Sequence, residues 1–406
     1  MTDLSFSNGD TDRWEQRKFE DCFNFPVSTN SLSRAMLNYD KGEVKNVHYG
    51  DVLIKYPSIL NIKKEEVPYI TDGSLETYTP NLLENGDLVF ADAAEDEAVG
   101  KAVEINGITN ENLVSGLHTI VARATKQKAE YFLGYYINSN IYHRQLLRLM
   151  QGSKVSAISK GNLQKTDVSF PENIEEQQKI GVFFKQLDDT ITLHQRKLDL
   201  FKKMKQGYLE KMFPKNGVQV PELRFAYFKD VWEQSKLGIK VNIIMGQSPN
   251  SENYTENPDD YILVQGNADM KNGYVVPRVW TTQITKQAQK GDLILSVRAP
   301  VGDIGKTDYD VVIGRGVAAI RGNEFIFQQL GKMKTNSYWS RYSTGSTFES
   351  INSNDIKEAT IMVPSSEEQE KIGVFLSNVD YSISLQQNKL DQLKFLKSAF
   401  LKKMFI

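Results

Sequence analysis

Two stretches of the chain, residues 175–213 and 367–405, carry apolar residues at alternating steps of three and four positions. Such spacing, held over several heptads, is typical of helices that pair in a left-handed coiled coil. We therefore predict two long helices that pack through this seam, with the packing of each helix on its own globular domain as the alternative. The predicted seam consists of Ile180, Phe184, Leu187, Ile191, His194, Leu198 and Phe201 in the first stretch and Ile372, Leu376, Val379, Ile383, Gln386, Leu390 and Leu393 in the second.

The two stretches are copies of one another. They are related by a constant offset of 192, and 21 of their 39 positions are identical. The polar residues of the seam also correspond, since His194 aligns with Gln386 and Lys205 aligns with Lys397. Polar residues at such positions usually fix the register of paired helices. A long internal repeat of this kind indicates a chain built from two related halves.

The globular segments before the two helices share further landmarks. Trp14-Glu15-Gln16 recurs as Trp232-Glu233-Gln234, Gly86–Phe90 recurs as Gly291–Leu295, and Pro171 and Pro364 precede the two helices. Each glycine-led motif reads as a turn followed by a strand. We predict an α/β (α+β) protein in which two similar globular domains are separated by two long antiparallel helices, with pseudo-two-fold symmetry. The predicted parts are a first domain at 1–172, a first helix at 173–214, a second domain at 215–364 and a second helix at 365–406.

The connection after the first helix predicts the direction of the second. Pro214 stops the first helix, and only a short linker precedes Trp232, so the second domain must lie near the C-terminal end of that helix. The second helix starts from the same domain and can pack on the first only by running back along it. We therefore predict an antiparallel pair with one domain at each end and with His194 beside Gln386 at the midpoint. Each helix would span about 58 Å, more than the ~34–36 Å of one turn of B-DNA.

Several motifs together point to one family. They are the two helical copies, VPELRF at 220–225, GDLILSVRAPVGDIGKT at 291–307 and IGRGVAAIRG at 313–322. With these motifs the chain resembles, over essentially its full length, the specificity subunit of type I restriction–modification enzymes. The resemblance implies two target-recognition domains, each of which binds one half of a bipartite site in double-stranded DNA. It also implies that the helices set the spacer between the halves.

The same resemblance implies partners and assigns the chemistry to them. Two methyltransferase (modification) subunits would dock on the long helices, and the assembly can recruit restriction or translocase subunits. S-adenosylmethionine, ATP and Mg would be bound only by those partner subunits. The chain itself is expected to have no cofactor and no catalytic residue.

Composition and charge limit how the chain meets its partners. Lys and Arg total 49 and Asp and Glu total 51, so the net charge of −2 requires any nucleic-acid contact to come from local basic groups. The single cysteine, Cys22, allows neither an internal disulfide nor a paired-cysteine metal site, and it fits a reducing cytosol. No run of about 18 apolar residues is present, so we expect a cytoplasmic protein with no membrane partner.

Two short motifs come close to catalytic signatures without matching them. Asn257-Pro258-Asp259-Asp260 lacks the second proline and the aromatic residue with which an amino-methyltransferase holds an exocyclic amine. Gly302–Thr307 resembles the end of a phosphate-binding loop, but the position of its first glycine is occupied by Pro300. None of the four histidines has the i, i+4 spacing of a metal site on a helix. The sequence therefore predicts no catalytic residue and no metal site.

Candidate DNA contacts in the second domain lie on predicted loops and strand ends. The candidates are Gln247, Ser248, Arg298, Arg315, Ser346 and Thr347. Glutamine can read adenine, arginine can read guanine or hold phosphate, and hydroxyl groups can hold phosphate. The alternative for the two arginines is an internal carboxylate partner, Asp292 or Asp303, and the alternative for the polar turn at 247–248 is an ordinary surface turn.

The first domain offers a weaker set of candidates. They are Lys55, Tyr56, His118, Ser153 and Lys154. Lys55 and Tyr56 follow the strand-like run Val52–Ile54, whereas His118 lies in an apolar run and has a satisfied, half-buried side chain as its alternative. An acidic loop would repel phosphate and reads most simply as solvated, although a carboxylate can also accept from cytosine N4. The acidic residues of this loop are Asp92, Glu95, Asp96 and Glu97.

Two other functions remain as alternatives to DNA recognition. A two-domain coiled-coil scaffold for protein or glycan partners would show no dependence on DNA sequence. A P-loop nucleotide hydrolase would lose nucleotide binding on Lys306→Ala. A specificity subunit should instead bind duplex DNA in a salt-sensitive way once methyltransferase is present, and Arg298→Ala should alter one half-site only.

Overall fold

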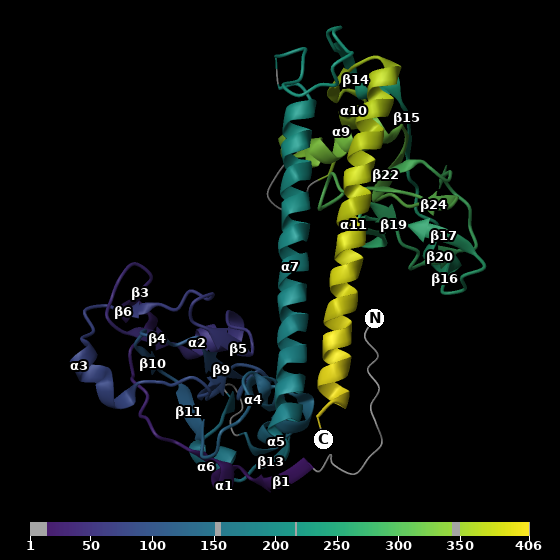
Figure 1. The fold of residues 1–406 in the computed structure, drawn as a ribbon. Helices are drawn as coiled ribbons and strands as arrows, with labels where there is room; N and C mark the ends of the chain where they lie inside the picture. The colour runs from purple at the N-terminus through teal and green to yellow at the C-terminus, as the bar shows by residue number, and fades with distance from the viewer. Residues whose placement is uncertain (1–13, 151–155, 216, 343–349, 406) are drawn as a thin grey trace. The chain divides into compact units, whose positions relative to one another are not determined.

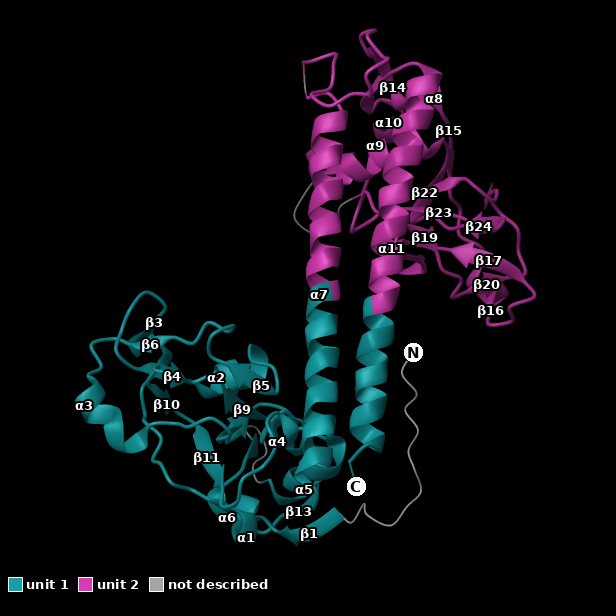
Figure 2. Ribbon diagram, in the orientation of Figure 1, with its two compact units in different colours: residues 1–193, 390–406 teal, residues 194–389 magenta. Residues whose placement is uncertain are grey.

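The structure is a computed structural model that describes residues 14–150, 156–215, 217–342 and 350–405. Its contacts divide the chain into two compact units, residues 1–193 with 390–406 and residues 194–389 (Figure 2). Two long helices, α7 (Ile174–Met212) and α11 (Ser366–Lys403), contribute residues to both units. We call the globular part from β1 to β13 the first domain and the part from β14 to β26 the second domain.

The first domain is built on a five-stranded sheet and a smaller four-stranded sheet (Figure 1). The larger sheet has, in spatial order, β2 (Phe23–Asn24), β11 (Thr119–Ala124), β7 (Leu88–Ala91), β9 (Ala102–Asn106) and β5 (Ile59–Asn61). The smaller has β10 (Leu113–Ser115), β4 (Lys45–Val47), β6 (Tyr69–Ile70) and β3 (Leu37–Asn38). The two-stranded pairs are β1 (Trp14–Lys18) with β13 (Asp167–Pro171) and β8 (Ala93–Ala94) with β12 (Ser156–Ala157). Its helices are α1 (Phe19–Cys22), α2 (Tyr49–Ile54), α3 (Leu75–Tyr78), α4 (Phe132–Ile137), α5 (Asn140–Leu149) and α6 (Lys160–Gln164).

The second domain has a six-stranded and a five-stranded sheet. The first of these has, in order, β15 (Asn242–Met245), β25 (Val317–Arg321), β22 (Leu293–Ser296), β23 (Ile304–Lys306), β19 (Tyr274–Val275) and β18 (Met270–Lys271). The second has β16 (Tyr254–Thr255), β20 (Trp280–Thr281), β17 (Tyr261–Val264), β24 (Val311–Ile313) and β21 (Gln287–Ala288). A further pair joins β14 (Glu233–Lys236) to β26 (Thr360–Val363), and the helices are α8 (Leu237–Lys240), α9 (Glu324–Thr335) and α10 (Ser353–Lys357).

The glycine-led motifs form the central strands of both domains and bury both of their faces. In β7, Leu88 and Phe90 belong to the cluster that contains α4 and α5, while Val89 belongs to the cluster formed with α2 and β4. In β22, Leu295 and Ile294 are divided in the same way between two clusters of the second domain. Successive side chains of a strand point to opposite faces, so a continuous apolar run supplies two cores at once.

The two long helices run antiparallel within each unit. In the first unit Phe183 contacts Phe400 with 5.2 Å between ring centroids, and Asp188 pairs with Lys397 at 2.5 Å. In the second unit Tyr208 contacts Phe375 and Lys205 pairs with Asp380 at 2.6 Å. The offset of 192 converts each contact of one unit into the corresponding contact of the other. The sequence repeat is therefore also a structural repeat: equivalent residues of the two helices make equivalent contacts in the two units.

The predicted seam residues are all buried or half-buried. Ile180 and Phe184 are part of the core of the first domain, and Ile372 and Leu376 are part of the core of the second. Each helix thus packs on its own domain at its start, as the alternative interpretation stated, and on the other helix further along.

His194 and Gln386 meet in the second unit. The Gln386 side-chain amide donates to the His194 carbonyl oxygen at 3.0 Å and also forms a hydrogen bond with His194 Nδ1. Each of these residues is the repeat equivalent of the other, as predicted from the spacing.

A repeated glycine lets each helix approach its domain. A Cβ on Gly181 would lie 2.6 Å from the Glu130 carbonyl oxygen, and a Cβ on Gly373 would lie 2.8 Å from Glu324 Cβ. Glu130 precedes α4, and Glu324 is the first residue of α9. The beginning of each long helix is thus seated against the beginning of a domain helix.

The structure corrects one prediction of local structure. Val52–Ile54 is helical and ends α2, so the prediction of a strand there is wrong. The His48 side chain accepts from the Gly50 N–H at 3.2 Å and caps this helix at its N-terminus. A three-residue apolar run cannot distinguish a strand from a short helix by periodicity.

Candidate nucleic-acid interface

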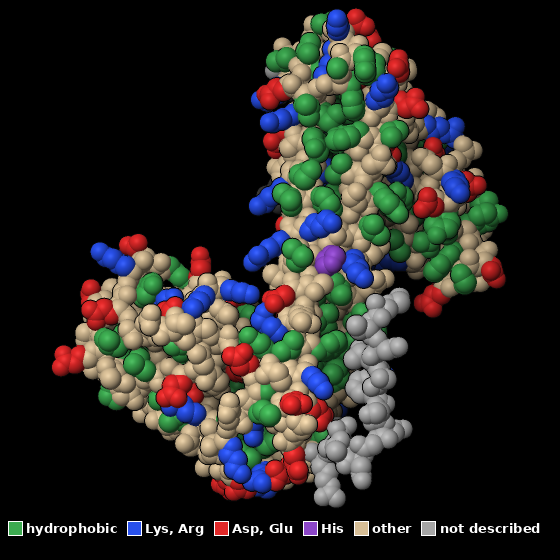
Figure 3. All heavy atoms as spheres, in the orientation of Figure 1, with side chains coloured by type: hydrophobic (Ala, Val, Ile, Leu, Met, Phe, Trp, Pro, Cys, Tyr) green, Lys and Arg blue, Asp and Glu red, His purple; other side chains and the backbone are tan. Residues whose placement is uncertain are grey.

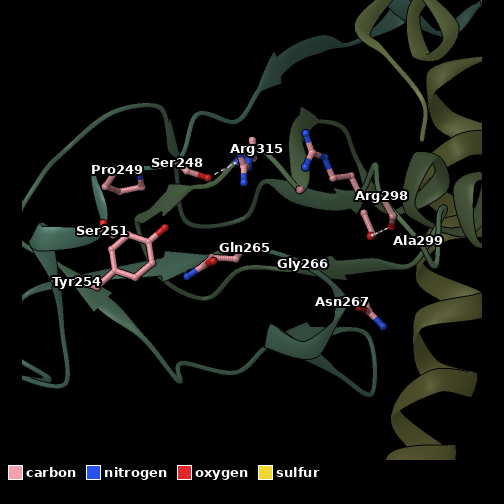
Figure 4. A pocket seen from close by; sticks show the side chains of 12 residues that line it. Ser248, Pro249, Ser251, Tyr254, Gln265, Gly266, Asn267, Arg298, Ala299 and Arg315 are labelled. Carbon is pink, nitrogen blue, oxygen red and sulfur yellow. Dashed lines mark hydrogen bonds between the residues drawn. The ribbon is translucent and has the colours of Figure 1, made fainter. Parts of the chain in front are cut away.

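The second domain has a polar concavity of about 460 Å³ that is formed by loops from separate strands (Figure 4). It is lined by Ser248, Pro249, Ser251, Tyr254, Gln265, Gly266, Asn267, Ser296, Arg298, Ala299, Arg315 and Gly316. Three of the predicted candidates, Ser248, Arg298 and Arg315, therefore lie in one place.

Backbone hydrogen bonds hold the loops of this concavity together. The Gly246 N–H donates to the Val317 carbonyl at 3.0 Å, and the Gly314 N–H donates to the Val264 carbonyl at 2.8 Å. A Cβ on Gly246 would lie 2.1 Å from the Gly314 carbonyl oxygen, so only glycine allows these two loops to approach so closely. Ser248 Oγ then accepts from the Arg315 N–H at 3.1 Å.

The two arginine side chains are exposed and available to a ligand. Among the described residues no ion pair includes Arg298 or Arg315. The carboxylates considered as their partners are engaged elsewhere: Asp292 lies 3.8 Å from Arg321, and Asp303 pairs with Lys334. A guanidinium group carries five N–H donors in a planar fork, which suits phosphate oxygens or the O6 and N7 atoms of guanine.

The concavity also contains polar residues that the sequence did not single out. Gln265, Asn267 and Tyr254 add an amide, a second amide and a phenol to its lining. The Gln265-Gly266-Asn267 turn directly follows β17, and a polar turn after an apolar strand is the signal that could have found it.

Gln247 is placed next to the concavity rather than in its lining. Its N–H donates to the Ile313 carbonyl at 2.8 Å, and its own carbonyl accepts from Thr285 Oγ1 at 2.5 Å. The side chain is exposed. The candidates Ser346 and Thr347 lie outside the described residues, as do Ser153 and Lys154 in the first half of the chain.

In the first domain, Tyr56 is a core residue and not a surface contact. Its side chain is 2% exposed, and its hydroxyl donates to the Glu66 carbonyl at 3.3 Å, so the prediction of DNA contact by Tyr56 is corrected. Burial raises the pKa of its phenol. Lys55 donates to the same carbonyl at 2.7 Å and lies over the Tyr39 ring, so its ammonium group already has partners.

His118 is exposed, contrary to the half-buried alternative. Its backbone is left-handed, with φ of 53°, and its Nδ1 lies 3.2 Å from an Asp92 carboxylate oxygen. Its ring stands edge-on to Tyr49, with 5.3 Å between centroids. Burial raises the pKa of the Asp92 carboxyl, while the neighbouring His118 acts in the opposite direction.

The segment that resembles a phosphate-binding loop is part of a sheet. Ile304–Lys306 forms β23 between β22 and β19, and Lys306 pairs with Glu324 at the start of α9. No helix begins directly after Thr307, so a phosphate cradle at a helix N-terminus is absent from this described segment. Among the residues that the structure describes, no group of three or more His, Cys, Asp or Glu has the arrangement of a metal site, and no helix is long and apolar enough to cross a bilayer.

Comparison with known proteins agrees with the internal repeat. The family model described as the type I restriction modification DNA specificity domain matches residues 11–203 and again residues 229–394. A putative type I restriction enzyme MjaX specificity subunit from Methanocaldococcus jannaschii is 27% identical over 394 residues, covering 94% of this chain and 90% of that protein. The MjaIX specificity subunit of the same organism is 34% identical over 113 residues, which is 27% of this chain and 26% of that protein.

Two solved structures share the fold. The crystal structure of a type I restriction-modification system S subunit from M. genitalium aligns with a TM-score of 0.65 and 15% identity, covering 99% of this chain and 98% of that one. A chain from a study of complex assembly and conformational transition of the type I R-M system aligns with a TM-score of 0.56 and 21% identity, covering 96% of both chains. With the specificity-domain model matched in both halves, the chain belongs to the family of type I restriction-modification DNA specificity subunits.

Proposed function

We propose that this chain reads a bipartite site in double-stranded DNA, one half with each domain, on behalf of a type I restriction–modification enzyme. The family match in each half supports two reading modules. The different side chains at their loops support two different half-sites. The proposal assigns sequence specificity to this chain and catalysis to its partners.

The observation that carries the proposal is a pair of arginines in the concavity of the second domain that form no ion pair with any described residue. Arg298 and Arg315 approach it from two separate strand ends, and Gln265 lies between them and Tyr254 in Figure 4. Bidentate arginine contacts to guanine discriminate by about 1–3 kcal/mol each, and hydroxyl and amide groups position the phosphate backbone. The concavity therefore has both kinds of group that a base-reading surface needs.

The long helices are proposed to dock two methyltransferase subunits, and the assembly can recruit restriction subunits. Figure 3 shows apolar side chains gathered along the helices of the second unit. The exposed apolar residues of these helices in that unit are Leu200, Met204, Val374, Tyr381 and Leu385. Exposed apolar groups on otherwise polar helices are typical of a protein interface. S-adenosylmethionine, ATP and Mg would then belong to those partners, which would also flip the adenine out of the duplex.

The decisive experiment maps methyladenine across a host genome with and without this chain, in the presence of its methyltransferase. A split motif that appears only with the chain is the expected result. Arg298→Ala should change one half of that motif and leave the other intact. Lys290→Ala is the matched control, because it removes one exposed positive charge from the same domain at a position outside the concavity.

Two results would contradict the proposal. A methylation pattern that is the same with and without the chain would exclude a role in specificity. Equal loss of both half-sites in a folded Arg298→Ala protein would show that the two domains do not read separate halves.

Binding should also weaken steeply as salt rises, because phosphate contacts release counterions.

A further inference from the structure

The two domains can be aligned residue by residue through equivalent backbone hydrogen bonds. The Asp92 N–H donates to the His118 carbonyl at 3.0 Å, and the Val297 N–H donates to the Gly316 carbonyl at 2.9 Å. The carbonyl of Asp92 accepts from Ile158, as the carbonyl of Val297 accepts from Ile351. Asp92 is therefore the counterpart of Val297 at the exit of the central strand.

The loop before the next strand aligns in the same manner. The Gly116 N–H donates to the Val47 carbonyl at 2.9 Å, as the Gly314 N–H does to the Val264 carbonyl. Gly116 and Gly314 are thus counterparts, and so are the residues two positions later, His118 and Gly316. The counterpart of the second-domain concavity in the first domain is the surface around Asp92 and His118.

The side chains at these equivalent positions differ in kind. Leu117 replaces Arg315, and Ala93 replaces Arg298, since Ala93 bridges to Ala157 as Arg298 bridges to Ser350. His48 replaces Gln265, but it is 6% exposed and caps α2, where burial lowers the pKa of its ring. The first domain thus has no guanidinium group at the two arginine positions and has a carboxylate and an imidazole beside them instead.

Asp92 and His118 are held in a fixed geometry on the surface. A backbone hydrogen bond and a side-chain contact of 3.2 Å join the same two residues, and Tyr49 holds the edge of the imidazole. The side chains remain 27% and 51% exposed. A left-handed conformation at a residue with a Cβ is strained by roughly 1 kcal/mol and is retained mostly where a site requires it. A pair of this kind is organised before any ligand arrives.

The free oxygens of the Asp92 carboxylate are hydrogen-bond acceptors. A carboxylate accepts on both oxygens, and an imidazole that donates its Nδ1–H to the carboxylate presents the lone pair of Nε2. Exposed acidic residues follow in the same loop, so this surface cannot lie along phosphates; these residues are Glu95, Asp96 and Glu97. On duplex DNA an acceptor is matched by an exocyclic amino group, which in the major groove is that of cytosine N4 or adenine N6.

Building on the proposed function, we propose that Asp92 and His118 determine the specificity of the first domain, by accepting a hydrogen bond from an amino-bearing base in its half-site. The second domain reads its half-site in the opposite way, because Arg298 and Arg315 donate hydrogen bonds to acceptors on the DNA. One chain would then combine an acceptor-type and a donor-type reader on the same backbone frame.

The test uses the full-length chain with its methyltransferase and duplexes that carry the mapped site. Each cytosine or adenine of the half-site that is independent of Arg298 is replaced in turn by its analogue lacking the exocyclic amino group. The wild-type complex should bind one of these duplexes roughly tenfold more weakly. The identity of that base, cytosine or adenine, shows which amino group is read. Asp92→Ala, which removes both acceptor oxygens, should bind that duplex and the natural one equally well.

A second variant, at His118, tests the inference even if the Asp92 variant does not fold. Asparagine tolerates the left-handed backbone, so His118→Asn should keep the loop and weaken recognition at the same or an adjacent base pair. The inference is overturned if both variants keep wild-type sensitivity to every amino-group deletion. If Arg298→Ala still shifts its own half-site, the proposed function stands while this inference fails. Loss of sequence dependence in the wild-type complex itself would instead reject the proposed function.

Discussion

The two domains share a backbone frame and differ in the chemistry mounted on it. The same hydrogen bonds join the central strand to its neighbours in both, yet Asp92 and His118 occupy the positions of Val297 and Gly316. Backbone bonds constrain only the path of the chain, because they involve no side-chain atom. Loop side chains can therefore change the ligand without changing the fold, which is what a reader of two unlike half-sites requires.

At one pair of equivalent strand positions the two domains have residues of opposite charge, Glu104 and Lys306. Glu104 pairs with Leu88 in register, and Lys306 pairs with the equivalent Leu293, so an acid and a base occupy corresponding places. The Glu104 carboxylate accepts from the Tyr131 and Gly134 N–H groups, both at 2.7 Å, and so binds the start of α4. Lys306 instead pairs with Glu324 at the start of α9. An acidic residue thus connects the sheet to a helix in the first domain, and a basic residue does so at the equivalent position in the second.

The largest expected effect comes from the glycines at which the helices meet their domains. Gly181→Ala should destabilise the chain by about 2 kcal/mol, because its Cβ would meet backbone atoms of Glu130 and Phe132 that cannot move aside. Gly373→Ala should cost less, about 1 kcal/mol, because its Cβ would lie 2.8 Å from Glu324 Cβ and no closer than 3.1 Å to a backbone atom, Phe325 N. Urea unfolding of the full-length variants measures both values.

Gly207 is the matched control for both substitutions. It lies in α7, and a Cβ there would meet nothing within 4 Å, so Gly207→Ala should stabilise by up to ~1 kcal/mol through helix propensity alone. If Gly181→Ala behaved like Gly207→Ala, the close approach of α7 to α4 would be refuted.

The second prediction separates the domains by pH. Burial raises the pKa of Glu104 to about 7, from the ordinary glutamate value of 4.5. A carboxyl with a raised pKa contributes stability that is fully present below about 4.5 and is lost as pH rises through about 7, because the folded state holds the proton longer. Glu104→Gln should therefore flatten the fall in melting temperature between these pH values.

Two histidines of the first domain change the pH dependence of stability in the opposite direction. The melting temperatures of variant and wild type must therefore be compared at each pH. Burial lowers the pKa of His48 and His143, which makes stability rise with pH toward the ordinary histidine value. Their contribution cancels in the difference.

The third prediction compares the two ion pairs between the helices. Asp188 also accepts from the Tyr135 hydroxyl at 2.8 Å, and its side chain is 18% exposed, against 34% for Asp380. A less exposed pair is less screened by solvent, so a double-mutant cycle of Asp188 with Lys397 should give a coupling of about 1 kcal/mol and exceed that of Asp380 with Lys205. The pair of Lys185 with Asp189, whose carboxylate is 57% exposed, should couple by no more than ~0.5 kcal/mol. Equal couplings at all three places would reject a role for burial.

The sequence was sufficient to predict the elements whose signal is long or repeated. The heptads predicted both long helices, and the glycine-led motifs predicted the central strands, because periodicity over many residues reflects one buried face. It failed at Tyr56 and at Val52–Ile54, where the apolar run is too short to separate a helix from a strand.

The proposed recognition surface could be predicted only in part. Arg298 and Arg315 stood out by residue type, but Gln265 and Tyr254 join them only through the parallel pairing of β17 with β24 and the pairing of β16 with β20. Such contacts between distant segments leave no local pattern. The correspondence of His118 with Gly316 likewise cannot be found in the sequence, because the two positions share backbone hydrogen bonds and no residue type.

The smallest expected effect concerns the contact between His194 and Gln386, where two equivalent residues of the repeat differ. His194 and Gln386 are repeat equivalents that face each other, so any asymmetry between the halves appears directly in this pair. Gln386→Leu leaves the half-buried His194 carbonyl and ring without their donor and should destabilise by about 1 kcal/mol. His194→Gln makes the pair symmetric and should change stability by less than ~0.5 kcal/mol, because an amide can replace the ring as acceptor. Thermal unfolding of the two variants in the same buffer measures the difference. If Gln386→Leu proved neutral while His194→Gln was destabilising, the imidazole would be acting through a contact other than Gln386.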